Sequence, residues 1–124
     1  MSTYPNESEM ARRIGENEAR FRDANEKIED AALRLQPDMN TLPFVCECGR
    51  PDCFAPLRLT VAEYELARQS ATFFVCLPGH QLIGKDLGRE VDIRDRFVIV
   101  EKLGPAGAVA EARDPRQQEA EQTG

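Results

Sequence analysis

The apolar residues of the first third of the chain recur at helical spacing. Large apolar side chains lie seven residues apart at Ile14, Phe21, Ile28 and Leu35. This spacing predicts one narrow apolar seam on a helix. Asn6 is a suitable N-cap, and Pro37 excludes the helical conformation from the residue before it. The pattern therefore predicts a long amphipathic helix over residues 7–35, within an N-terminal segment 1–36.

The period changes in the middle of the chain. Strand-like alternation is found in FVCEC (44–48), PLRLT (56–60), TFFVCL (72–77), GREVDIRD (88–95) and RFVIVEK (96–102). Thr60 and Glu63 form a capping-box pair that starts a short helix between the second and third of these segments. Helices and strands in this order predict an α+β fold, with a small antiparallel sheet and one short helix in a domain over residues 37–103. Residues 104–124 contain few large apolar groups, so we expect a disordered C-terminal tail.

Composition limits the kind of protein to which these elements belong. A chain of 124 residues that is 41% apolar can bury one modest core. The net charge is −6 and is spread evenly, with two more acidic than basic residues in each of the three segments. Nucleic-acid binding depends on a basic surface that neutralises phosphates. We therefore expect no nucleic-acid partner.

Hydropathy gives no sign of a membrane or secretory segment. The longest apolar run, residues 71–77, is far shorter than the roughly 20 residues that span a bilayer. The first 25 residues are polar and charged, without the apolar core of a signal peptide. We expect a cytoplasmic protein that does not enter membranes. In a reducing compartment, thiols more often bind metals or carry out redox chemistry than form structural disulfides.

Three cysteines are close together at the start of the central domain. Cys46 and Cys48 are two residues apart on an extended segment and face the same side, and the turn-forming GRPD leads to Cys53. A tetrahedral zinc needs one more ligand, for which the candidates are His80 and Cys76. We favour His80 because PGH is a loop, whereas Cys76 lies in an apolar strand. The predicted cofactor is Zn²⁺, bound by Cys46, Cys48, Cys53 and His80.

Several other kinds of chemistry fit these residues less well. The spacing C-x-C-x4-C differs from that of plant-type ferredoxins. A Cys–His nucleophile would need His80 as its base, and a ligated imidazole has no free lone pair. We therefore expect a non-catalytic zinc protein without a small-molecule substrate, acting as an interaction or regulatory adaptor. Its long helix would bind a protein partner or a second copy. The alternatives are a thiol redox or zinc-sensing switch and a zinc-ribbon factor associated with nucleic acid.

A set of motifs along the chain resembles a known group of proteins. The motifs are the helix ENEARFRDANEKI (16–28), FVCEC with a third cysteine five residues on, LTVAEYE (59–65), PGH (78–80) and RFVIVEK (96–102). Together they resemble a group of short uncharacterised bacterial proteins from high-GC genomes, over residues 14–115. The resemblance implies the same architecture and supports Cys46, Cys48, Cys53 and His80 as the ligand set. In that group other small residues take the position of Cys76.

Overall fold

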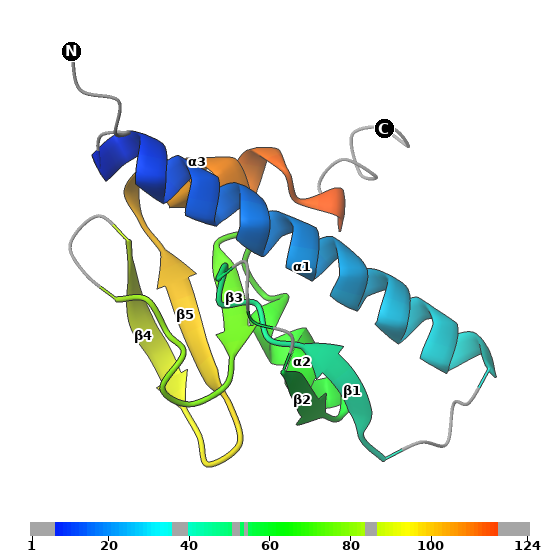
Figure 1. Cartoon of the computed structure of the whole chain (residues 1–124). Helices are drawn as coiled ribbons and strands as arrows, with labels where there is room; N and C mark the ends of the chain where they lie inside the picture. The colour runs from blue at the N-terminus through cyan, green and yellow to red at the C-terminus, as the bar shows by residue number, and fades with distance from the viewer. Residues whose placement is uncertain (1–6, 36–39, 51–52, 54, 84–86, 117–124) are drawn as a thin grey trace.

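The computed structural model describes residues 7–35, 40–50, 53, 55–83 and 87–116. Its elements are α1 (Glu7–Leu35), β1 (Leu42–Val45), β2 (Pro56–Leu59), α2 (Val61–Ala67), β3 (Phe73–Cys76), β4 (Gly88–Ile93), β5 (Val98–Lys102) and α3 (Gly104–Ala112). The α+β class and the long N-terminal helix are confirmed. In Figure 1, α1 crosses the length of the molecule with α3 against it. The predicted cap Asn6 and stop Pro37 lie outside the described residues.

The strands form two antiparallel sheets where the sequence predicted one. β1 pairs with β2, and the second sheet has the order β3-β5-β4. The hairpin of β4 and β5 turns near Asp95, as the alternation predicted. The chain leaves β1 at Val45 to form the cysteine-rich loop, and α2 follows β2 directly.

The main core lies between the two sheets and α2. Its buried members are Leu42, Phe44, Leu57, Leu59, Tyr64, Ala67, Val75, Phe97 and Ile99. Phe44 and Tyr64 stack with their ring centroids 4.6 Å apart. The predicted capping box is present: the Glu63 N–H donates to Thr60 Oγ1 at 3.0 Å, and the Thr60 N–H donates to Glu63 Oε1 at 2.9 Å. These two bonds satisfy orphan donors at the start of α2.

The interpretation of residues 104–124 as a disordered tail is wrong for residues 104–116. Residues 104–112 form α3, and Ala106 and Ala110 are buried. The small residues of this segment offer little apolar area, but they let two helices approach closely. A Cβ added at Gly15 of α1 would lie only 3.0 Å from the Cα of Ala106. Residues 117–124 lie outside the described part of the chain.

The buried face of α1 is mostly polar and is not the predicted seam. Its buried residues are Gly15, Glu18, Ala19, Arg22, Asn25 and Glu29. In the predicted seam, Ile14, Phe21 and Ile28 are only half-buried, and Leu35 is 79% exposed. Polar residues can occupy this face because they find partners across the interface. The guanidinium of Arg22 donates to the carbonyl oxygens of Ala71 at 2.5 Å and Ala110 at 2.8 Å.

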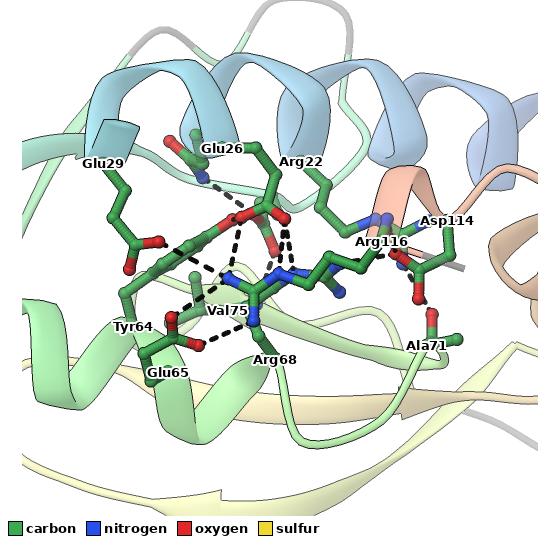
Figure 2. A network of polar contacts seen from close by, with 12 residues as sticks. Arg22, Glu26, Glu29, Tyr64, Glu65, Arg68, Ala71, Val75, Asp114 and Arg116 are labelled. Atoms are coloured by element: carbon green, nitrogen blue, oxygen red, sulfur yellow. Dashed lines mark hydrogen bonds and ion pairs between the residues drawn. The ribbon is translucent and has the colours of Figure 1, made fainter. Parts of the chain in front are cut away.

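A network of ion pairs joins α1, α2 and the segment after α3, as Figure 2 shows. Arg68, just after α2, contacts Asp114 at 2.5 Å and Glu26 of α1 at 3.3 Å. Arg116 contacts three glutamates: Glu26 at 2.6 Å, Glu65 at 2.8 Å and Glu29 at 3.4 Å. The Tyr64 hydroxyl donates to Glu26 at 2.8 Å. The network holds α1, α2 and the segment after α3 together. The composition of these segments did not predict that they associate.

One member of this network makes stability depend on pH. Burial, together with the nearby Glu65 carboxylate, raises the pKa of Glu29 from 4.5 to about 7. A carboxyl whose pKa is raised on folding contributes stability that is lost as the pH rises from its unfolded to its folded value. Between pH 5.5 and pH 8, we expect the unfolding free energy of Glu29→Gln to rise by about 1–2 kcal/mol relative to that of wild type, because glutamine does not ionise. Urea unfolding at both pH values measures this difference.

Asp30→Asn is the matched control. Asp30 lies on the exposed side of the same helix, where its side chain is 70% exposed and pairs with Arg34. The difference in unfolding free energy between wild type and Asp30→Asn should be the same at pH 5.5 and pH 8. A gap that changes as much as the one for Glu29→Gln would show that the pH dependence does not come from Glu29.

Candidate metal centre

The structure brings the four predicted ligands into one cluster. The ligand atoms of Cys46, Cys48, Cys53 and His80 all lie within 4.8 Å of one another. His80 Nδ1 lies 3.5 Å from the Cys53 sulfur and 3.8 Å from the Cys46 sulfur. Ligand atoms of a tetrahedral zinc with ordinary Zn–S and Zn–N bond lengths lie about 3.5–3.8 Å apart. The cluster therefore has the donor atoms of a four-coordinate metal site, and the two distances from His80 Nδ1 match the spacing of such a site.

The cysteine loop turns at a residue that must be glycine. Gly49 follows Cys48 and has φ +79°, a region that residues with side chains rarely adopt. A Cβ at this position would also lie 2.7 Å from the Cγ of Glu18 on α1. Beyond the turn, the Cys53 N–H donates to the Arg50 carbonyl at 3.1 Å. This turn returns Cys53 to the two cysteines at the end of β1.

The histidine is placed by a tight turn after β3. The His80 N–H donates to the Leu77 carbonyl at 2.9 Å, which closes a four-residue turn. Pro78 holds the second position and Gly79, with φ +90°, the third, as in a type II turn. The LPGH sequence thus fixes the direction of the His80 ring from the end of a buried strand.

The surroundings of one sulfur in the cluster, that of Cys46, favour its thiolate form. The Cys76 thiol hydrogen-bonds the Cys46 sulfur, and the Leu77 N–H donates to the same sulfur at 3.2 Å. Together they lower the pKa of Cys46 to about 5, against the opposing effect of burial. Burial raises the pKa of Cys48 to about 12. A bound metal would take thiolates as ligands, so its binding at neutral pH would release at least the proton of Cys48.

Cys76 is close to the cluster but outside the group of four. It is fully buried on β3, paired with Val98 of β5. Its hydrogen bond to Cys46 and its burial both raise the pKa of Cys76 well above the usual range. A thiol held neutral in this way can donate to a ligand sulfur without being a ligand. This position agrees with the choice of His80 over Cys76.

Two buried polar residues beside the ligands were missed by the sequence analysis. Glu47 lies between two ligand cysteines and is 1% exposed, and Asn25 of α1 is fully buried against it. Burial raises the pKa of Glu47 to about 7. Only one signal pointed to Glu47: a charged residue inside an otherwise apolar strand pattern. Asn25 lies within the motif ENEARFRDANEKI, but nothing in its spacing connected it to the cysteines, because its partners are 20 and 22 residues away.

In comparisons with protein-family models, with curated proteins and with solved structures, none matches this chain. Within the described residues, no helix is both long and apolar enough to cross a membrane. The fold and the donor set define a small α+β domain with a Cys₃His site that can bind a metal.

Proposed function

We propose that this chain is a non-catalytic zinc protein in which Cys46, Cys48, Cys53 and His80 hold Zn²⁺. The observation that carries the proposal is the convergence of three sulfurs and one imidazole nitrogen within 4.8 Å. Thiolate and imidazole are the ligands that zinc takes in closed structural sites. With four protein ligands, a tetrahedral ion keeps no position for water or substrate. The metal then serves to hold the cysteine loop and the His80 turn together.

The first test is the metal content of protein purified without chelator. We expect about one zinc per chain by elemental analysis, because a closed Cys₃His site retains its ion through purification. Protein refolded with excess Zn²⁺ and then desalted should reach the same ratio. A chain that stays free of zinc after both treatments would refute the proposal.

The biological role that we propose is that of an adaptor acting through α1. Support comes from the C-terminal end of this helix, where Leu33 is 51% and Leu35 79% exposed. Exposed leucines at a helix end offer apolar area to a second protein or a second copy. The redox-switch alternative has less support, because Cys46 and Cys48 have no exposed surface and Cys53 is 7% exposed. Oxidants react with accessible thiolates.

A further inference from the structure

Asn25 of α1 holds the backbone next to the first zinc ligand. The Val45 N–H donates to Asn25 Oδ1 at 2.7 Å, and Asn25 Nδ2 donates to the Val45 carbonyl at 2.8 Å. The side-chain amide thus pairs with both polar groups of Val45 in the way that a neighbouring strand would. Val45 is the last residue of β1 and precedes Cys46. The Asn25 side chain therefore supplies strand-like hydrogen bonds to the residue just before Cys46.

Glu47 makes a similar connection on the other side. Its N–H donates to the Val75 carbonyl at 2.8 Å, and its Oε1 accepts the Val75 N–H at 3.0 Å. Its second oxygen accepts a hydrogen bond from Asn25 at 2.7 Å. Val75 belongs to β3, the strand that leads to the His80 turn. A continuous buried chain of hydrogen bonds therefore runs from α1, through the segment with two cysteines, to the strand before the histidine.

A second asparagine of α1 contacts the other end of the same segment. Asn17 Nδ2 donates to the Gly49 carbonyl at 3.3 Å. Asn17 and Asn25 are eight residues apart, which places them about 80° from each other around the helix axis, so both can face the body. Their contacts at Val45 and Gly49 lie on either side of Cys46 and Cys48. The segment that supplies half of the ligand set is thus held from α1 at both ends.

We propose that Asn25 and Glu47 are positioning residues of the metal centre, through which the docking of α1 on the body sets the metal affinity. This inference rests on the proposed zinc function. Groups that orient metal ligands from outside the coordination sphere typically contribute 10–100-fold in metal affinity. Because coupling is reciprocal, metal binding strengthens the docking of α1 by the same factor. A partner that draws α1 away from the body would therefore weaken metal binding.

Zinc affinity, measured by competition with a chromophoric chelator, tests the inference. We expect Asn25→Ala to weaken zinc binding by at least about tenfold. In Glu47→Gln, the side-chain oxygen can still accept the Val75 N–H, but the NH₂ group faces the Nδ2 donor of Asn25. We therefore expect a smaller loss of zinc affinity than in Asn25→Ala. The control is Arg116→Ala, which removes the ion pairs of Arg116 with Glu26 and Glu29 of α1 but touches neither ligand segment. Because α1 keeps its Asn25 contacts with Val45 and Glu47 in this variant, its zinc affinity should stay within about threefold of wild type.

Co²⁺ provides a second readout, because its visible absorption reports tetrahedral thiolate geometry. We expect the band of Glu47→Gln to shift or weaken while that of Arg116→Ala matches wild type, even if Asn25→Ala fails to fold. Equal losses of zinc affinity in all three variants would overturn the inference, since metal binding would then follow general stability. Wild-type affinity and spectra in both Asn25→Ala and Glu47→Gln would overturn it as well. A wild-type chain that binds neither metal would instead refute the proposed function.

Discussion

Cys48→Ser is expected to abolish zinc binding and to unfold most of the chain under conditions where the wild type is native. Cys48 is fully buried among the other ligands, so no water-exposed group can replace its sulfur. Structural zinc binds small domains with about 10–16 kcal/mol, whereas whole domains are stable by only about 5–15 kcal/mol. Loss of the metal therefore removes an amount comparable to the entire stability. Zinc content, far-UV circular dichroism and thermal unfolding measure the effect together.

Cys76→Ser is the matched control, because it makes the same chemical change in the same buried cluster. A serine hydroxyl can still donate to the Cys46 sulfur, so we expect zinc to be retained, with a stability loss of about 1–2 kcal/mol. His80→Ala should behave like Cys48→Ser. If Cys76→Ser lost the metal and His80→Ala kept it, the ligand assignment would be wrong.

The parts of the fold that the sequence predicted are those encoded by neighbouring residues. The span of α1 followed from helical spacing, and the start of α2 from Thr60 and Glu63, which form both bonds of the capping box. The hairpin of β4 and β5 followed from alternation with a turn near Asp95. Each of these signals acts over a few residues, so each can be read without knowing the tertiary structure.

The failures concern contacts between distant segments. The seven-residue spacing predicted an apolar seam on α1 formed by Ile14, Phe21, Ile28 and Leu35. The buried face of this helix instead carries Arg22, Asn25 and Glu29. The buried Arg22 is stabilised by the carbonyl oxygens of Ala71 and Ala110, which are 49 and 88 residues away. Likewise, the sequence of α3 contains too little apolar area to predict a core helix. Its burial depends on a close approach to α1 at Gly15, which only the structure shows.

The same distinction between local and distant contacts applies to the candidate site. The donor atoms could be predicted because cysteines two and five residues apart, and a histidine in a PGH loop, carry their chemistry in local spacing. The supporting residues could not, since Asn25 lies in a helix 20 residues before its backbone partner Val45. Nothing in the helical segment distinguishes Asn25 from an exposed polar residue such as Asp30.

The buried ion pair between Glu18 of α1 and Lys102 of β5 leads to the second large prediction. Both side chains are at most 1% exposed, and burial raises the pKa of Glu18 to about 7 although Lys102 opposes the shift. Removing one partner of such a pair leaves an uncompensated buried charge, which costs about 3–5 kcal/mol. We therefore expect Lys102→Met to destabilise the zinc-bound protein by about that amount at pH 8, as measured by urea unfolding.

The pH dependence and a double variant separate this electrostatic cause from lost packing. Without the ammonium group, the folded pKa of Glu18 rises further, so ionisation costs stability over a wider range. The loss caused by Lys102→Met should therefore grow from pH 6 to pH 8. Adding Glu18→Met should recover most of the lost stability, because two apolar side chains of similar volume can replace a buried ion pair. If the loss does not change with pH and the double variant is as unstable as Lys102→Met, then Lys102 stabilises the fold through its methylene packing, and the charge on Glu18 contributes nothing to holding α1 against β5.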